Sequence, residues 1–545
     1  MTTHQEDDVD PRIPAAQQTH ATPQSTTARP DATPGLSRRG LLLGAAAALA
    51  AGPLAATAAH AATATTPATA PATRAAGATA AAARTPKVLV IGLDGAMLTR
   101  IKDSGAPNLA ALMAGGLTAA SSLYTSPMAG TSSGPGWSTI ATGVWPDKHN
   151  VRDNNFTAPA FAAYPDFLTR VETANPALST YVVASWAPIA DTIYSGRVDT
   201  RVATPSAEYD TGTTARAVAR LRDGNPDAVF VQLDNVDHAG HSSGSASQAY
   251  LDAIRGVDAQ VGQILTAVRG RAGYAQEDWL VMVTADHGHT PTGGHGGSTW
   301  EERQTFLIAN GSAFPAGSVR FDVRMVDIAP TALAHLGITA DPAWGLDGTP
   351  VPALVPDDFD ALRPQLTGRV DETGIPAGVL GFTRTAPAGW SVDNSAMGTG
   401  GVTEWRGWSF TTDEFWTKAQ RDQNRELNVR SRNVFAVADS DEWADKTFQG
   451  NYDSTLVSPE YPVAGRSSVP VAFTTFYRPE GAQTARVLAV WDGGTPVEVK
   501  SYTADTNGRQ RLDLAVPAGA SRLRLRFRYT GSNNWYWVVD NVRVG

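Results

Sequence analysis

The chain has 545 residues, of which 42% are hydrophobic and 18% charged, so it can form folded domains and is neither wholly disordered nor fibrous. The formal net charge of -9 is spread without long blocks of one sign, so the sequence carries no nucleic-acid footprint. Cysteine is absent, which excludes disulfides, thiolate metal sites and cysteine nucleophiles.

Residues 1–61 are predicted to be a twin-arginine export signal. Arg38 and Arg39 directly precede a run of Leu, Gly and Ala, which ends at a small-residue pattern at residues 59–61. The alternative, a membrane anchor, is disfavoured because a run this rich in Ala and Gly is only weakly apolar. We therefore expect an extracellular or cell-envelope protein. Residues 62–85, mostly Ala, Thr and Pro, are expected to be a linker.

Three apolar runs in the middle of the chain, 87–93, 228–233 and 279–284, are predicted to be strands of a buried parallel sheet. Helical patterning lies between them, as in residues 249–268. Each run leads directly towards Asp or His, and ligands of open α/β sheets bind beyond the carboxyl ends of the strands. Residues 86–365 are therefore expected to form a catalytic α/β domain.

Histidine and aspartate gather at these predicted strand ends, and five of the ten histidines lie between residues 238 and 295. A single Asp-His pair is usually a loop feature, but several at successive strand ends favour two divalent metal ions, zinc first among them. The candidate ligands are Asp94, Asp237, His241, Asp286, His287 and His295. His238 and His289 are interpreted as exposed or as neighbours of the ligands, and His335 as structural.

A Gly- and Pro-rich loop within residues 125–143 offers a nucleophile. It leads into a short predicted helix, whose free N-terminal N–H groups favour phosphate binding. The residues alone leave Thr131, Ser132 and Ser133 as alternatives.

From about residue 86 to 352 the chain resembles the alkaline phosphatase superfamily, and most of all its type I phosphodiesterase/nucleotide pyrophosphatase branch. The motifs that carry the resemblance are Asp94-Gly95, Trp137–Gly143, Pro146–His149, Asp237–His241, Asp286–Gly288, His295-Gly296 and Asp327–Thr331. The resemblance implies an alkaline-phosphatase-like, doubly wound, mostly parallel sheet. It also implies hydrolysis of a small phosphoric ester through a covalent phosphoserine.

By the same resemblance, the nucleophile is Ser133, ten residues before Gly143, and Asn154 binds substrate 21 residues after Ser133. The residues implied for the first metal ion are Asp237, His241 and His295. Those implied for the second are Asp94, Asp286, His287 and the Ser133 oxygen.

Two departures from the family pattern bear on the substrate. Nucleotide-processing members place a base-stacking Phe directly after the nucleophile, where this chain has Gly134. A preference for nucleotides is therefore not expected unless Trp137 or Trp186 supplies the ring. Sulfatases of the superfamily carry Arg four residues after a modified Cys or Ser, where this chain has Trp137, so a sulfatase is not expected. Monoesters, diesters and phosphonates remain alternatives.

Short alternating runs between residues 469 and 544 predict an all-β sandwich, a jelly roll, over residues 380–545, with a linker at 366–379. Eight of the 14 tryptophans lie in this region, either as core residues or as platforms for sugars. The candidate ligands of a structural calcium ion are Asp439, Asp441 and Asp540. The alternative function is a catalytically weak protein that binds a cell surface or a glycan through this sandwich.

Overall fold

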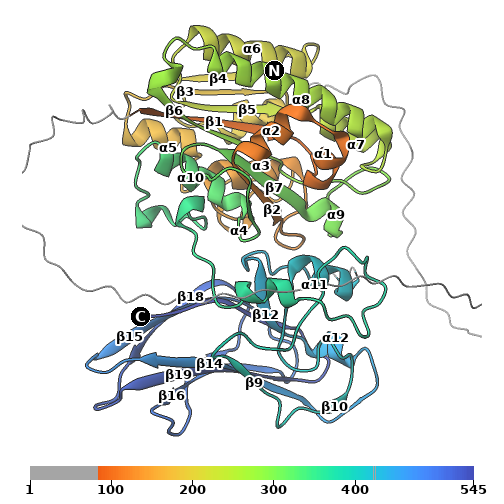
Figure 1. Cartoon of the computed structure of the whole chain (residues 1–545), viewed down its shortest axis with the longest axis vertical. Helices are drawn as coiled ribbons and strands as arrows, with labels where there is room; N and C mark the ends of the chain where they lie inside the picture. The colour runs from red at the N-terminus through yellow and green to blue at the C-terminus, as the bar shows by residue number, and fades with distance from the viewer. Residues whose placement is uncertain (1–83, 422, 424) are drawn as a thin grey trace, which may run out of the picture. The chain divides into compact units, whose positions relative to one another are not determined.

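A mixed eight-stranded sheet organises the N-terminal half of the computed structural model, which describes residues 84–421, 423 and 425–545 (Figure 1). The strands are β1 (Thr85–Leu93), β2 (Leu117–Ser122), β3 (Thr180–Ala184), β4 (Thr200–Ala203), β5 (Ala228–Leu233), β6 (Glu277–Thr284), β7 (Gln304–Asn310) and β8 (Ser318–Arg320). Their order in the sheet is β4-β3-β5-β1-β6-β7-β2-β8, and only β7 runs antiparallel to its neighbours β6 and β2. The predicted mostly parallel sheet is confirmed.

The three predicted strands lie together at the centre of this sheet as β5, β1 and β6. Leu93, the last residue of β1, pairs with Leu233, the last residue of β5. Gly92 pairs with Thr284, the last residue of β6. The loops that follow the three strands therefore leave the sheet side by side, at one edge.

Helices cover both faces of the sheet (Figure 1). Those whose apolar residues share one core are α1 (Leu98–Ser104), α2 (Pro107–Gly115), α6 (Tyr209–Asp223), α7 (Asn235–Ser243) and α8 (Gln248–Arg269). Those of the opposite core are α3 (Ser133–Thr142), α5 (Phe167–Ala174) and α10 (Ile328–His335). Two short helices, α4 (Pro146–His149) and α9 (Trp300–Arg303), lie in connecting segments. Leu89 and Val90 of β1 belong to opposite cores, which is why this strand is apolar on both faces.

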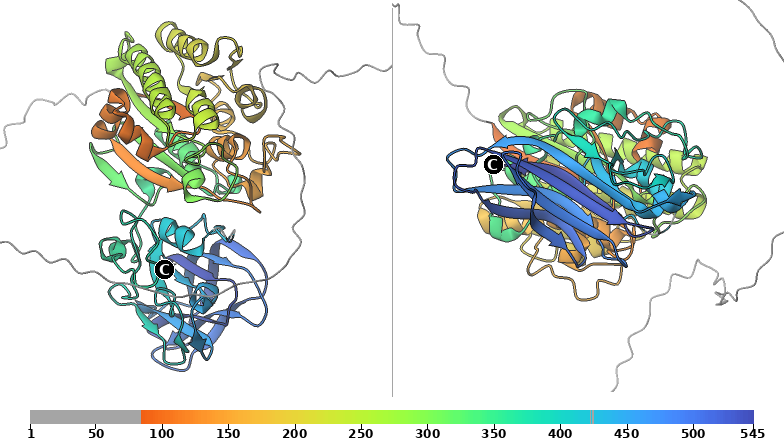
Figure 2. Two further views of the ribbon diagram at one scale, coloured as in Figure 1. Left: turned by 90° about the vertical axis from the view of Figure 1, so that its right-hand side faces the viewer. Right: turned by 90° about the horizontal axis from the view of Figure 1, so that it is seen from below.

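The C-terminal half contains two five-stranded antiparallel sheets, which Figure 2 shows from two further sides. The first consists of β11 (Ser409–Thr412), β12 (Val434–Ala438), β20 (Trp537–Val544), β15 (Ser468–Tyr477) and β18 (Thr506–Ala515). The second consists of β17 (Val497–Tyr502), β16 (Thr484–Trp491), β19 (Arg522–Gly531), β14 (Tyr452–Pro462) and β9 (Ser391–Asp393). The remaining elements are the pair β10 (Thr399–Gly400) and β13 (Phe448–Gln449), and helices α11 (Asp413–Gln420) and α12 (Ser440–Ala444). Phe473 of β15 and Phe527 of β19 pack edge to face, with centroids 5.3 Å apart, so the two sheets share one core.

Most tryptophans of the C-terminal half belong to this core. The six buried ones are Trp390, Trp405, Trp408, Trp416, Trp443 and Trp537. A buried indole cannot serve as a platform for a sugar, so these residues stabilise the fold. The segment predicted as a linker, 366–379, contributes Leu366, Ile375 and Val379 to the same core.

The acidic residues considered for calcium have partners from the chain itself. The Arg425 guanidinium lies 2.9 Å from an Asp439 oxygen and 3.0 Å from an Asp441 oxygen. Asp540 instead accepts the backbone N–H of Arg432 at 2.7 Å. The Arg425 guanidinium therefore supplies positive charge to Asp439 and Asp441, whereas the second Asp540 oxygen is buried without a hydrogen-bond partner among the described residues, and the calcium site stays a prediction.

The predicted export signal with Arg38 and Arg39 lies outside the described residues, as does most of the 62–85 segment. Within the part that is described, no helix combines the length and apolarity needed to cross a bilayer.

Residues of the two sequence halves meet in a buried polar cluster within one compact unit. Arg303, the last residue of α9, is fully buried and donates hydrogen bonds to Asp413 at 2.9 Å and to Thr417 at 2.6 Å. Ser122 of β2 donates to the same Asp413 carboxylate at 2.6 Å. Asp413 therefore neutralises a guanidinium that has no access to water.

Replacing Asp413 by Ala is expected to lower the free energy of unfolding by about 3–5 kcal/mol, because the buried Arg303 charge loses its partner. Urea denaturation would measure the change. The matched control is Asp513→Ala, which removes an exposed ion pair with Arg511 and should change stability by ~0–1 kcal/mol. If both variants lose the same small amount of unfolding free energy, the buried pair does not stabilise the fold as expected.

Candidate metal and nucleophile site

The predicted ligands converge where β1, β5 and β6 end. Asp94 directly follows β1, and Asp286 with His287 lies just beyond β6. Asp237 and His241 lie one helical turn apart on α7, which follows β5, so their side chains share a face of that helix. His295 comes from the loop between β6 and α9. The register of the central strands thus brings together residues that are up to 201 positions apart in the sequence.

One cluster consists of Asp94, Asp286 and His287, all fully buried. His287 Nε2 lies 3.5 Å from Asp94 Oδ1 and 3.2 Å from Asp286 Oδ2. Neither of these two carboxylate oxygens has a hydrogen-bond partner among the residues that the structure describes. A buried, unpartnered carboxylate oxygen carries a large desolvation cost, which a bound cation would remove. These three residues therefore fit a divalent metal ion.

The second cluster is centred on Asp237. Its Oδ2 lies 3.3 Å from His241 Nε2, and its Oδ1 lies 3.5 Å from His295 Nε2. The two histidine nitrogens are 3.0 Å apart. The other ring nitrogen of His295 lies 2.7 Å from the Thr131 carbonyl oxygen. Such a bond orients the ring and leaves Nε2 for a metal. Asp237, His241 and His295 thus also fit a cation.

His289 is more closely engaged than the sequence indicated. It is fully buried, and its Nε2 lies 2.7 Å from Asp237 Oδ1. Its ligand atom also lies within 4.8 Å of those of Asp237, His287 and His295. His238, by contrast, is exposed. In the sequence, His289 is two residues after the candidate ligand His287. This spacing does not show that the His289 side chain faces the same site.

The carboxylates of the site have strongly perturbed pKa values. Burial, and then the neighbouring carboxylates, raise the pKa of Asp94 well above its usual range. Burial also raises the pKa of Asp286 well above its usual range. The pKa of Asp237 is lowered instead. Burial alone would raise this pKa, but hydrogen bonds from His241 and His289 outweigh that effect. Burial keeps His287 neutral by lowering its pKa, and a neutral ring is the form that binds metals.

Ser133 is the first residue of α3, and its Oγ lies 3.3 Å from His287 Nε2. The Thr131 hydroxyl is already engaged, since it donates to the Gly297 carbonyl at 3.0 Å and accepts the Gly296 N–H at 2.9 Å. Ser132 is the N-cap residue of α3. Of the three hydroxyls that the residues alone left open, Ser133 is the one in contact with the candidate metal ligands.

Asn154 contacts Gly134, the residue that follows the predicted nucleophile Ser133. Its side-chain oxygen accepts the backbone N–H of Gly134 at 2.7 Å, which leaves the amide nitrogen as a donor for substrate. A Cβ at Gly134 would lie 2.7 Å from the Asp153 carbonyl oxygen. The position after Ser133 therefore has no room for the Phe that the resemblance to nucleotide-processing enzymes would place there.

Trp137 cannot take over base stacking, because it is fully buried. Its indole N–H donates to Asp94 Oδ2 at 2.8 Å, and Gln232 donates to the same oxygen at 2.9 Å. Gly92 leaves space for the indole, since a Cβ there would lie 2.4 Å from the ring. Trp186 is only half-buried and lies 6.0 Å from the Phe156 ring, two residues beyond Asn154. Of the two tryptophans considered for stacking, Trp186 is the one with an accessible surface.

A protein-family model described as type I phosphodiesterase/nucleotide pyrophosphatase matches residues 88–431 of this chain. Among curated proteins, GPI ethanolamine phosphate transferase 2, catalytic subunit, of Homo sapiens is 30% identical over 135 residues, 24% of this chain and 14% of that protein. The 2,3-bisphosphoglycerate-independent phosphoglycerate mutase of Streptomyces coelicolor is 32% identical over 152 residues, 26% of this chain and 28% of that protein. The chain thus spans less than a third of the length of these relatives.

Two solved structures illustrate the similarity in structure. Murine ectonucleotide pyrophosphatase/phosphodiesterase 5 in complex with AMP is 15% identical with a TM-score of 0.38, over 47% of this chain and 96% of that one. A 2-O GAG sulfatase is also 15% identical with a TM-score of 0.38, over 60% of this chain and 80% of that one.

Proposed function

Because the chain belongs to the type I phosphodiesterase/nucleotide pyrophosphatase family, whose members act on phosphoester bonds, we propose that it is a metal-dependent hydrolase of phosphoric esters. The observation that carries the proposal is the position of Ser133 Oγ, 3.3 Å from His287 Nε2, a nitrogen that itself lies within 3.5 Å of two buried carboxylate oxygens. The sequence around Arg38 and Arg39 supports export by the twin-arginine route.

The proposed metal ions are two zinc ions. The residues that would hold the first are Asp237, His241 and His295, and those for the second are Asp94, Asp286, His287 and Ser133. Bound metal ions supply positive charge that lowers the pKa of a ligated hydroxyl and stabilises a departing oxyanion. His289 would hold Asp237 in place through its 2.7 Å contact.

The residues themselves account for the bond changes of the proposed reaction. Ser133 Oγ gives up its proton and forms a bond to phosphorus, while the ester P–O bond breaks and the leaving oxygen takes up a proton. Asn154 Nδ2 would donate a hydrogen bond to a non-bridging oxygen of the phosphoryl group. Water then attacks the phosphoserine, the Oγ–P bond breaks, and the Ser133 hydroxyl is restored.

A side-by-side assay of aryl phosphate monoester, diester, phosphonate and sulfate ester would test this function. The expected result is hydrolysis that releases phosphate or a phosphate monoester. A chelator should abolish this activity, and added zinc should restore it. Because the curated relatives include a transferase and a mutase, the assay should also contain an added alcohol as acceptor. Exclusive transfer to the alcohol, or turnover that survives chelation, would refute a metal-dependent hydrolase. So would turnover of the sulfate ester alone.

The half-buried Trp186 is proposed to contact the leaving group of aromatic substrates. Replacing it by Ala is expected to lower kcat/KM for an aryl diester by about 5- to 150-fold, the worth of one ring stack. An alkyl diester, which has no ring to stack, is the control substrate and should lose much less. An equal loss on both substrates would show that Trp186 acts on the fold and not on the leaving group.

A further inference from the structure

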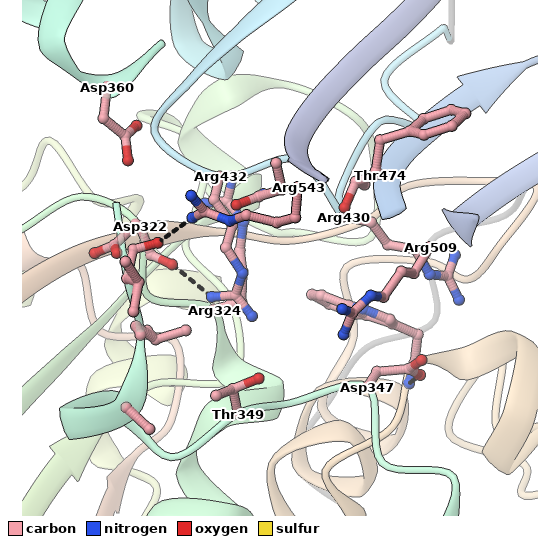
Figure 3. Close-up of a pocket in the computed structure, with 16 residues that line it drawn as sticks. Asp322, Arg324, Asp347, Thr349, Asp360, Arg430, Arg432, Thr474, Arg509 and Arg543 are labelled. Atoms are coloured by element: carbon pink, nitrogen blue, oxygen red, sulfur yellow. Dashed lines mark hydrogen bonds between the residues drawn. The ribbon is translucent and has the colours of Figure 1, made fainter. Parts of the chain in front are cut away.

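A cavity of about 290 Å³ lies away from all of the candidate metal ligands and is lined by residues of both sequence halves (Figure 3). Its volume is close to the lower end of the range of ~300–1,000 Å³ for small-molecule sites. We call it the arginine cavity after the five arginines that line it: Arg324, Arg430, Arg432, Arg509 and Arg543.

The acidic residues that line the cavity are engaged elsewhere. Asp347 accepts hydrogen bonds from Lys148 at 2.6 Å and from a backbone N–H at 2.9 Å. The Asp322 carboxylate accepts hydrogen bonds from Arg320 Nε at 2.8 Å and from Arg320 Nη2 at 2.5 Å. Asp360 accepts the backbone N–H groups of Asp357 and Val434. None of these three carboxylates forms an ion pair with an arginine of the cavity, and Arg432 is instead paired with Asp327, which does not line it.

Three of the five arginines lack a carboxylate partner in the part of the chain that the structure describes. Arg324, only 4% exposed, donates through Nε and Nη2 to the Ser431 carbonyl oxygen. Arg543 donates to two backbone carbonyls, and Arg509 takes part in no ion pair of the described residues. Guanidinium groups that form no direct ion pair keep N–H donors for an anion, so an anion that entered here would be stabilised.

Arg430 adds a second, independent observation. Its side chain is only 9% exposed, and its Nη2 holds the Asp147 carboxylate at 2.7 Å. Its Nη1 is buried and has no hydrogen-bond partner within residues 84–421, 423 and 425–545. A buried charged donor left unsatisfied in this way destabilises the structure, and an oxygen acceptor from a ligand would satisfy it.

We infer that the arginine cavity binds a small phosphate-bearing anion at a site distinct from the catalytic centre. Planar guanidinium groups match phosphate oxygens in pairs, and Arg is the preferred residue where that geometry matters. The volume leaves room for a substituent beyond the phosphate group. Trp145, which also lines the cavity, follows α3 by three residues, so the ligand would lie near the end of that helix opposite Ser133.

Equilibrium dialysis with labelled inorganic phosphate, on the metal-loaded enzyme, would test the site. The double variant Arg430→Gln/Arg509→Gln is expected to bind one phosphate fewer per chain than the wild type. The matched control is Arg511→Gln on the same strand, an exposed residue paired with Asp513, which should bind as the wild type does. The single variant Arg509→Gln changes an exposed side chain and should weaken the same site at least tenfold, even if the double variant misfolds.

Equal phosphate binding by wild type and both cavity variants would overturn the inference. The test does not depend on the proposed hydrolase function. If the wild type binds one phosphate and the double variant binds none, the arginine cavity is supported. That result would count only against phosphate binding at the proposed catalytic centre. Loss of phosphate inhibition at the catalytic centre, without a change in the number of phosphates bound, would contradict a separate site.

Discussion

The Ser133→Ala variant is expected to lose kcat for an aryl phosphate ester by about 10³- to 10⁶-fold, the range seen when a catalytic nucleophile is removed. The loss follows from the geometry, since Ser133 is the hydroxyl within 3.3 Å of the His287 ring nitrogen. Steady-state assay gives the rate, and acid quenching of the wild type followed by peptide mapping would locate the phosphate on Ser133.

The matched control is Ser132→Ala, which removes the adjacent hydroxyl at the N-cap of α3. That side chain makes no capping hydrogen bond, so activity within about tenfold of the wild type is expected. Phosphate found on Thr131 or Ser132 but not on Ser133 would reject the assignment of the nucleophile.

The second large effect is expected from Asp286→Asn, which should lower kcat/KM by about 10²- to 10⁴-fold, equivalent to several kcal/mol of transition-state stabilisation. Asp286 Oδ2 is buried without a partner, and the amide of Asn would offer a weaker ligand without the negative charge. Elemental analysis should find two metal ions per chain in the wild type and one in the variant.

Asp278→Asn, on the same strand β6, is the matched control, because its carboxylate accepts an exposed hydrogen bond from Ser312 and is not among the candidate metal ligands. It should retain both metal ions and full activity. One tightly bound metal ion per chain in fully active wild-type enzyme would overturn the two-metal assignment.

The central strands were predictable because local patterns determine them. β1, β5 and β6 are apolar on both faces, so their runs stand out from the surrounding sequence, and β5 has the predicted bounds. Helix α8 extends only one residue beyond each end of the predicted 249–268 segment. Convergence of Asp and His beyond these strands followed from the general rule for ligand sites in such sheets.

Features that depend on contacts between distant residues could not be predicted. Nothing near Gly134 in the sequence shows that the Asp153 carbonyl occupies the space of its missing side chain. The burial of Trp137 against Gly92 is of the same kind, and it turns a residue considered for stacking into the hydrogen-bond donor of Asp94. Similarly, Arg425 is 14 residues from Asp439, too far for a local charge pattern to reveal the pair.

The buried pair of Arg303 and Asp413 also has a consequence for biosynthesis. Arg303 closes α9, directly after the loop that carries His295, yet its partner lies 110 residues further along the chain. At translation rates of ~5–20 residues per second, roughly 5–20 seconds separate the synthesis of the two. During that interval Arg303 of a nascent chain can bond the Leu123 carbonyl but has no Asp413 carboxylate to neutralise it, so this guanidinium reaches its final buried, paired state only after the C-terminal half has been made.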